Sequence, residues 1–261
     1  MGAPRPELVR EWLEFAIETA QLGGTFTLGL FRTGATVESK SNHTPVTAAD
    51  RGAEERMRAR IEAHYPSHGI VGEEYGEKRG EGPARWFLDP IDGTVSFIHG
   101  VPLYSTLVGL EWEGSMLAGV IHLPALGETV YAARGLGCYA NGRRVRVSTV
   151  KRLEDACLLS SDGASFARYG READFHRLRA RCRVDRTWGD AYGYAMVATG
   201  RAEIMVDAAV APWDVAAVLP IIEEAGGHFH DWDGRVSHQV SHSLATNAAI
   251  HAEVVRALAG E

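Results

Sequence analysis

The spacing of two aspartates after an apolar run is the feature of this chain that indicates chemistry most directly. Asp89 and Asp92 stand three residues apart in the sequence Asp-Pro-Ile-Asp-Gly-Thr. Pro90 fixes its own φ and pushes the preceding residue toward an extended backbone, while Gly93 lets the chain pass close to a ligand. Both carboxylates would then point at one place, with the Ile91 carbonyl as a third oxygen. Hard cations such as Mg²⁺ prefer oxygen ligands of this kind.

A hydroxyl residue comes directly after this pair of acids. Thr94 and the amides that follow it are expected to open a helix, whose N-terminus favours an anion. The run therefore suits divalent metal ions held against a phosphate group. The alternative is a plain Asx-type turn after a strand, which explains Asp-Pro and Asp-Gly pairs without any ligand.

Composition limits the classes of protein that fit. The chain has 261 residues, 45% of them hydrophobic, and a net charge of −7, so it lacks the basic character that broad nucleic-acid binding needs. A phosphate ligand stays compatible, because bound metal ions supply positive charge locally. No apolar run approaches the ~20 residues that span a bilayer, and no secretory signal is visible. Cys138, Cys157 and Cys182 have no metal-ligand spacing. We expect reduced thiols, a cytoplasmic location, a small-molecule substrate, and no membrane or nucleic-acid partner.

The first part of the chain has two helical segments followed by strands. Hydrophobic spacing from Leu8 predicts a helix that stops at Gly23–Gly24, and a capping box predicts another from Thr47 to Tyr65. A hairpin turn is expected at Asn141–Gly142. The predicted strands are 69–72, 85–88, 104–112, 116–122 and 129–133.

Helices and strands alternate after residue 150. The predicted strands are 156–160, 202–206 and one at Phe229, and the predicted helices are 172–182, 192–199, 214–225 and 250–258. This alternation predicts a layered α/β fold. We expect one structural unit with a soft boundary. Residues 1–150 would carry the metal motifs, 151–261 would carry the residues that select the substrate, and the active site would lie between them.

Four sequence boxes in this order resemble the inositol-monophosphatase superfamily of Mg²⁺-dependent, lithium-sensitive phosphatases. They are Thr-Ala-Ala-Asp at 47–50, Gly-Glu-Glu at 72–74, Trp-Phe-Leu-Asp-Pro-Ile-Asp-Gly-Thr at 86–94, and Trp-Asp-Val-Ala-Ala at 213–217, the last continuing to Gly226–Gly227. The resemblance covers almost the whole chain. It implies alternating α-β-α-β-α layers, which is the sugar-phosphatase fold, and a homodimer.

The resemblance also implies a set of metal ligands. Glu73, Asp89 and the Ile91 carbonyl are similar to the ligands of a first metal. Asp89 would bridge to a second metal held by Asp92 and Asp214. Mg²⁺ is the expected ion, two or three per site, with Mn²⁺ as a substitute. The alternative for Asp214 is a favourable charge at a helix N-terminus, although its apolar surroundings suit burial, where an unpaired carboxylate is costly.

Further residues are implied to act on the water and the phosphate. Thr94 and Glu73 resemble the pair that orients the attacking water, and Gly93 with Thr94 would bind the phosphate. Asp50 would support the water through Thr94 or through a third, weaker metal. Asp50 also fits the acid of a capping box. Glu74 is either an acid supporting the ligands or a solvated surface residue.

The choice of ester depends on another segment. Trp188-Gly189-Asp190 and the downstream Asp207 resemble the histidinol-phosphate phosphatases of this superfamily. Histidinol phosphate carries an ammonium group and an imidazole, which Asp190 and Asp207 would pair with, and Trp188 could form an apolar or cation–π wall. The prediction is hydrolysis of histidinol phosphate in histidine biosynthesis. The alternatives are an inositol-1-phosphate or broad sugar-phosphate phosphatase, a non-catalytic binding protein on the same fold, and, for Asp190, a simple helix N-cap.

Two features have no assigned role at this stage. The histidines between His228 and His242 fit either a zinc site or a solvated turn, and the solvated turn is favoured because no cysteine accompanies them. The loop Ser160-Ser161-Asp162-Gly163 resembles the loop that precedes the substrate segment in the family, and no ligand is assigned to it.

Overall fold

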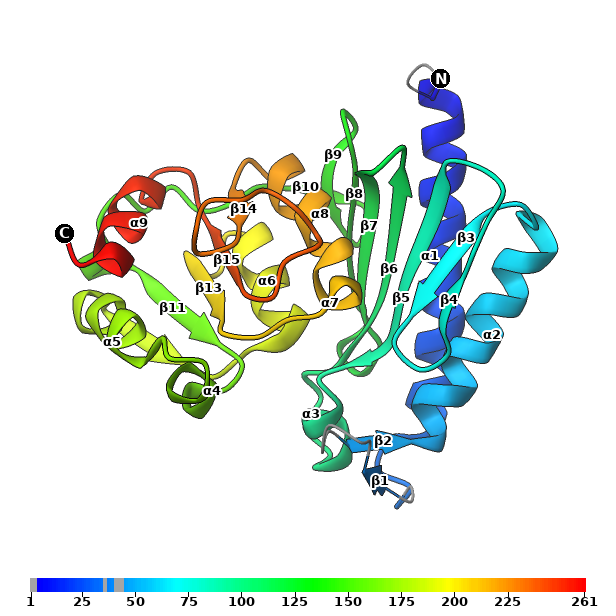
Figure 1. The fold of residues 1–261 in the computed structure, drawn as a ribbon, viewed down its shortest axis with the longest axis horizontal. Helices are drawn as coiled ribbons and strands as arrows, with labels where there is room; N and C mark the ends of the chain where they lie inside the picture. The colour runs from blue at the N-terminus through cyan, green and yellow to red at the C-terminus, as the bar shows by residue number, and fades with distance from the viewer. Residues whose placement is uncertain (1–3, 35–36, 40–44) are drawn as a thin grey trace.

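Alternating layers of helices and sheets build the computed structural model, which describes residues 4–34, 37–39 and 45–261. Two helices cover an eight-stranded sheet, a second group of helices lies behind that sheet, and a five-stranded sheet with outer helices follows (Figure 1). The layered α/β class and its α-β-α-β-α order are confirmed. No helix within these residues is both long enough and apolar enough to cross a membrane.

The first layer consists of α1 (Pro6–Leu30) and α2 (Ala48–His64). The predicted stop of the first helix at Gly23–Gly24 is wrong, because α1 continues through both glycines. A Cβ added at Gly24 would lie 2.4 Å from Cδ2 of His122. The glycines therefore do not end the helix: they allow it to lie close to the sheet.

The eight-stranded sheet has the order β10-β9-β8-β7-β6-β5-β3-β4. Its strands are β3 (Gly69–Gly72), β4 (Gly76–Lys78), β5 (Ala84–Asp92), β6 (Ser105–Trp112), β7 (Ser115–Leu123), β8 (Glu128–Ala133), β9 (Gly137–Ala140) and β10 (Arg143–Val145). The predicted strands agree to within a residue at each end, except that β5 extends through Asp92. A short pair, β1 (Val37–Ser39) and β2 (Pro45–Thr47), precedes α2.

Alternation along β5 divides the core between two layers. Trp86 and Leu88 are fully buried against α1 and α2, whereas Phe87 belongs to the core on the opposite face of the sheet. Successive side chains of a strand point to opposite faces, so Asp89 projects from the same face as Phe87. That face is covered by α6 (Asp190–Ala198), α7 (Pro212–Ala216) and α8 (Val218–Glu224).

The predicted helix over 214–225 is two helices, α7 and α8, which meet at Ala217. This junction packs directly on the sheet, because a Cβ added at Gly119 of β7 would lie 2.0 Å from the carbonyl oxygen of Ala217. The contact holds the beginning of α7, and with it Asp214, at a defined place over β5 and β6.

The smaller sheet has the order β12-β11-β13-β15-β14. Its strands are β11 (Cys157–Ser160), β12 (Val184–Arg186), β13 (Ile204–Asp207), β14 (His228–His230) and β15 (Ser243–Thr246), and the helices beyond it are α4 (Gly163–Arg168), α5 (Glu172–Arg181) and α9 (His251–Ala259). One apolar core contacts both sheets, and the division of the chain near residue 150 stays a prediction.

Candidate active site

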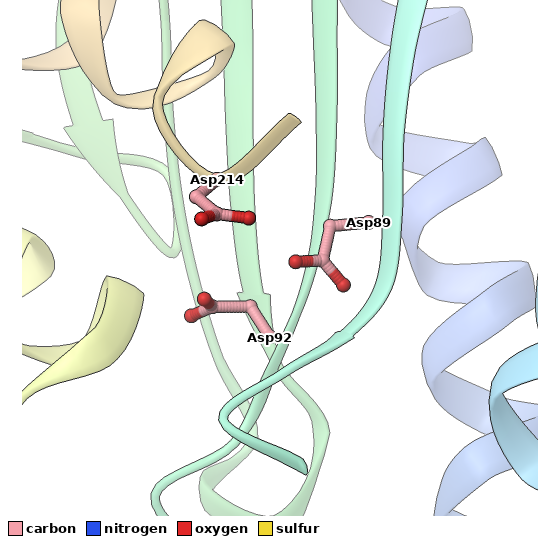
Figure 2. A group of neighbouring side chains, drawn as sticks. All are labelled: Asp89, Asp92 and Asp214. Carbon is pink, nitrogen blue, oxygen red and sulfur yellow. The ribbon is translucent and has the colours of Figure 1, made fainter. Parts of the chain in front are cut away.

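Three carboxylates from two distant parts of the chain converge between the larger sheet and α7. Asp89, Asp92 and Asp214 each offer an oxygen, and these oxygens all lie within 4.8 Å of one another. Figure 2 shows the three side chains pointing toward a common space, two from the end of β5 and one from α7. Among the residues that the structure describes, this is the one group of three or more potential metal ligands. Such a set of oxygens suits a hard divalent cation.

An irregularity in β5 brings the first two acids together. Residues three apart on a regular strand point to opposite faces, but the register of β5 against β6 shifts between Asp89 and Asp92. A bulge of this kind redirects a side chain at the end of a strand. The N–H of Ile91 donates to Asp89 Oδ1 at 3.0 Å, which closes the turn. Gly93 follows with φ +83, and α3 (Thr94–Ile98) begins directly after it.

Hydrogen bonds from the backbone and from a hydroxyl hold Asp92 and Asp214 in place. Asp92 Oδ2 accepts from the N–H of Ala191 at 2.5 Å and from the Ser105 hydroxyl at 3.1 Å. Asp214 Oδ2 accepts from the N–H of Ala211 at 2.7 Å, at the start of α7. The carboxylates are thus fixed in place before any ligand binds.

The proximity of the acids makes their ionisation unfavourable. Burial and the charges of Glu73, Asp92 and Asp214 raise the pKa of Asp89 well above its usual range. Burial, Asp190 and Asp214 do the same for the pKa of Asp92. Burial raises the pKa of Asp214 to about 7, against the hydrogen bond from Ala211. A bound cation would relieve this repulsion.

Glu73 lies beside this group, directly after β3. Its N–H donates to the Leu88 carbonyl at 3.2 Å, and its charge contributes to the raised pKa of Asp89, Asp214 and Asp50. Glu73 is not one of the three residues whose oxygens lie within 4.8 Å of one another. Its role as a ligand stays a prediction.

A fully buried glutamate, which the sequence did not single out, holds this segment. Glu54 of α2 accepts from the N–H groups of Glu74 at 2.7 Å and Tyr75 at 3.2 Å, and pairs with Arg58 at 2.6 Å. A Cβ added at Gly72 would lie 2.1 Å from Glu54 Oε1. Glu54 stands in a charged helical segment that reads as solvated surface, so no local signal identified it.

Both interpretations of Asp50, as the acid of a capping box and as a support of the attacking water, are compatible with its surroundings. Its Oδ2 accepts from the N–H of Thr47 at 2.8 Å and from the Thr47 hydroxyl at 2.6 Å, so the predicted capping box is present. Its Oδ1 is buried and has no hydrogen-bond partner among the described residues. Burial raises the pKa of Asp50 to about 6. A buried oxygen of this kind can accept a hydrogen bond from a water or bind an ion.

Thr94 and Asp190 border the acidic group from two sides. The Thr94 hydroxyl donates to the Ile91 carbonyl at 3.1 Å. A Cβ added at Gly93 would lie 2.9 Å from Asp190 Oδ2, so this carboxylate lies against the backbone of the turn. Asp190 is the first residue of α6, and the N-cap position before it is occupied by Gly189. Burial raises the pKa of Asp190 to about 6.

The remaining residues predicted to select the substrate have different surroundings. Trp188 is 41% exposed, with the guanidinium of Arg186 6.0 Å from its ring centroid. Asp207 is only 7% exposed, and both of its oxygens accept hydrogen bonds, from the Ser161 N–H at 3.2 Å and from the Tyr194 hydroxyl at 2.7 Å. Direct contact of either residue with substrate stays a prediction.

The histidines of the 228–242 segment do not form a metal group within the part of the chain that the structure describes. The favoured solvated turn is wrong for two of them, because His230 and His238 are 6% and 4% exposed. Nε2 of His238 lies 3.2 Å from Glu111 Oε2, and Arg85 also pairs with Glu111. The partner of His238 comes from a distant strand, and sequence spacing does not reveal it.

Known proteins are similar to this chain in architecture and in sequence. The model of the inositol monophosphatase family matches residues 8–260. A histidinol-phosphatase of Chlorobaculum parvum is 46% identical over 226 residues, which cover 86% of this chain and 87% of that protein. A fructose-1,6-bisphosphatase/inositol-1-monophosphatase of Thermotoga maritima is 37% identical, with 81% of each chain covered. The solved structure of an IMPase of Thermotoga maritima has a TM-score of 0.87 at 32% identity, covering 96% of this chain and 97% of that one.

Proposed function

The chain belongs to the inositol monophosphatase family and is a phosphoric monoester hydrolase. From that premise we propose that it hydrolyses histidinol phosphate to histidinol and phosphate, as a step of histidine biosynthesis. We also propose that the protein depends on Mg²⁺, acts in the cytoplasm and forms a homodimer. The approach of the Asp190 carboxylate to Gly93, beside the acidic group, is the observation that carries the choice of substrate.

The donor set fits divalent ions. Asp89, Asp92 and Asp214 offer oxygens within 4.8 Å of one another, in surroundings that raise the pKa of all three. We assign them to the metals together with Glu73 and the Ile91 carbonyl. When bound, the ions would supply positive charge to the phosphate and make a water acidic enough to attack phosphorus. Hydrolysis of phosphate monoesters requires up to ~10²¹-fold acceleration, so strong electrostatic stabilisation is needed.

The chain's own residues would orient the reactants. We assign the phosphate to Gly93 and Thr94, where a left-handed glycine lets the backbone turn into α3. We assign the orientation of the attacking water to Glu73 and Thr94, supported by Asp50, whose Oδ1 lacks a partner among the described residues. The water would add to phosphorus and give a proton to a carboxylate, the P–O bond to the alcohol would break, and the departing alkoxide oxygen would take up a proton, which leaves the alcohol and phosphate.

Selection of the alcohol is assigned to the beginning of α6. Asp190 presents an anionic oxygen next to the phosphate site, where the ammonium or imidazole of histidinol can pair with it. Inositol carries only neutral hydroxyls and gains less from this charge. Trp188 is exposed enough to stack on a ring, and Asp207 completes the acidic surroundings. A relative of 46% identity that is named a histidinol-phosphatase supports the same choice.

Steady-state kinetics tests the substrate. We expect kcat/KM with Mg²⁺ to be higher for histidinol phosphate than for inositol 1-phosphate. Asp190→Asn should reduce that ratio about 10- to 100-fold, because hydrogen bonds to charged groups contribute about 1.5–3 kcal/mol. Asp162→Asn is the matched control, since Asp162 is exposed and caps α4, and Asn caps equally well. An unchanged ratio in Asp190→Asn would contradict the assignment of this residue.

A second experiment tests the hydrolase itself. We expect Asp92→Asn to lose activity toward every ester, because Asp92 belongs to the acidic group and anchors α6 through Ala191. Activity of the wild type should disappear with a chelator and return with Mg²⁺ or Mn²⁺. A purified protein that is inert toward a broad panel of esters with either metal would support a binding protein on the same fold instead.

A further inference from the structure

Asp190 has a backbone conformation that side-chain-bearing residues rarely adopt. Its φ is +51, in the left-handed region, directly before the regular turns of α6. Such a conformation is strained and persists only where the surroundings hold it. The feature that holds Asp190 therefore also decides where its carboxylate points.

The hydroxyl of Ser161 contacts the backbone of Asp190. The N–H of Asp190 donates to Ser161 Oγ at 2.7 Å. The neighbouring Gly189 lies so close to the same residue that an added Cβ would be 2.1 Å from the Cα of Ser161. The loop after β11 and the beginning of α6 are thus interlocked at Ser161, although 29 residues separate Ser161 from Asp190 in the sequence.

Ser161 is itself held by a hydrogen bond to the buried Asp207. Its N–H donates to Asp207 Oδ1 at 3.2 Å, and Asp207 Oδ2 accepts from the Tyr194 hydroxyl at 2.7 Å. The Tyr194 hydroxyl also contacts Ser243 Oγ at 2.5 Å, and Tyr194, Asp207 and Ser243 are all buried. Asp207, which the sequence suggested as a substrate contact, thus holds the loop that holds Asp190.

The opposite side of the same helix end is anchored to the acidic group. The N–H of Ala191 donates to Asp92 Oδ2 at 2.5 Å. Asp190 is therefore fixed between two anchors, Ser161 on one side and Asp92 on the other, with its carboxylate against Gly93. Losing the anchor at Ser161 would let the carboxylate move without altering the acidic group itself.

We propose that Ser161 is a positioning residue for substrate selection: its hydroxyl holds Asp190 in the left-handed conformation that presents the carboxylate to the cationic end of the leaving alcohol. This inference rests on the proposed function, since it needs Asp190 to recognise that cationic end. It concerns a residue that contacts neither the reacting phosphate nor the metal ligands through its side chain. Ser161 therefore affects which ester is chosen more than how fast the phosphate is transferred.

The test is a double-mutant cycle on the full-length protein with Mg²⁺. kcat/KM is measured for histidinol phosphate and inositol 1-phosphate in the wild type, Ser161→Ala, Asp190→Asn and the double variant. We expect Ser161→Ala to reduce the histidinol-to-inositol ratio about tenfold, the effect of about one hydrogen bond, with kcat/KM for inositol 1-phosphate changed much less. In the Asp190→Asn background the same substitution should change the ratio by less than about twofold, because Ser161 acts through Asp190.

A control separates positioning from loss of folded structure. Ser165→Ala removes a hydroxyl that only bonds to the Asp162 carbonyl within α4, and it should leave the ratio unchanged. Urea denaturation of each variant gives the folded fraction by which the rates are corrected. A merely structural role of Ser161 would lower activity toward both esters equally.

The outcomes distinguish this inference from the proposed function. A wild type without preference for histidinol phosphate overturns the proposed function and this inference with it. A wild-type preference that survives Ser161→Ala overturns the role of Ser161 alone. An equal effect of Ser161→Ala in both backgrounds also overturns it, because Ser161 would then act independently of Asp190.

Discussion

Removing one charge from the acidic group should stabilise the metal-free protein. In Asp214→Asn the Oδ1 atom can still accept from the N–H of Ala211, so the hydrogen bond at the start of α7 is retained while the charge is lost. The pKa of Asp214 rises from 3.8 to about 7 on folding. Each pKa unit corresponds to about 1.4 kcal/mol, so ionised Asp214 costs the metal-free fold about 4 kcal/mol. Burial is the largest part of this cost, and the charges of Glu73, Asp207 and Asp190 add to it. Because the neighbouring acids can share the proton, we expect a gain of about 2–4 kcal/mol at pH 8.

The dependence on pH follows from the sign of the shift. A carboxyl whose folded-state pKa is raised stabilises the fold below its unfolded pKa, and this stability is lost as pH rises through the folded pKa. The advantage of Asp214→Asn should thus be small near pH 4 and should develop between pH 4 and about pH 7. Urea denaturation of chelator-treated protein at several pH values measures it. Added Mg²⁺ should stabilise the wild type, by about 2.7 kcal/mol at 100 times Kd, and the variant much less.

Asp162→Asn serves as the matched control, because this exposed carboxylate caps α4 and is not one of the three acids of the group. It should leave the free energy of unfolding unchanged at every pH. If metal-free Asp214→Asn is no more stable than the metal-free wild type at pH 8, burial and the surrounding carboxylates do not raise the pKa of Asp214 as described, and the assignment of the metal centre loses its electrostatic basis.

Three further predictions concern helix packing, pH and catalysis. Gly24→Ala should destabilise the protein by about 1–3 kcal/mol in urea denaturation, because its Cβ would lie 2.4 Å from His122. Gly29 has open space around it, so Gly29→Ala should not destabilise the protein. Equal losses of stability in the two variants would contradict the close packing of α1 on the sheet. Burial and the neighbouring His228 lower the pKa of His251 to about 4, below its unfolded value. The free energy of unfolding should therefore fall as pH decreases from about 6.5 toward 4. His251→Gln should flatten this dependence in urea denaturation, and an unchanged slope would refute the role of His251. Asp50→Asn should reduce kcat about 10²-fold or more with little change in the urea midpoint if Asp50 assists the water, and full activity would leave Asp50 as a helix cap alone.

Local sequence patterns predicted the parts of the structure that depend on short-range physics. The strand, proline and glycine around Asp89 and Asp92 were enough to predict two acids at the end of a strand, and the structure brings both to the same group. Asp214 could be connected to them only through resemblance to a family, because more than a hundred residues intervene. Its distance to the pair is set by the contact of Ala217 with Gly119.

Long-range contacts account for what the sequence did not predict. Gly23–Gly24 reads locally as a helix stop, but the sheet beneath α1 requires residues without a Cβ at this place. Glu54 reads as a surface charge, yet it is fully buried under the segment that carries Glu73. The positive φ of Asp190 and its bond to Ser161 depend on a loop far away in sequence. In each case a tertiary partner overrides the local preference.

We propose that a metal-dependent site recognises the cationic alcohol of its ester through Asp190. Phosphate release from histidinol phosphate and inositol 1-phosphate, measured side by side in the wild type and Asp190→Asn with and without Mg²⁺, tests it most directly. We expect no release without metal, a wild-type preference for histidinol phosphate, and a preference reduced about 10- to 100-fold in Asp190→Asn. Equal kcat/KM for the two esters in the wild type, or release that persists under chelation, would contradict it.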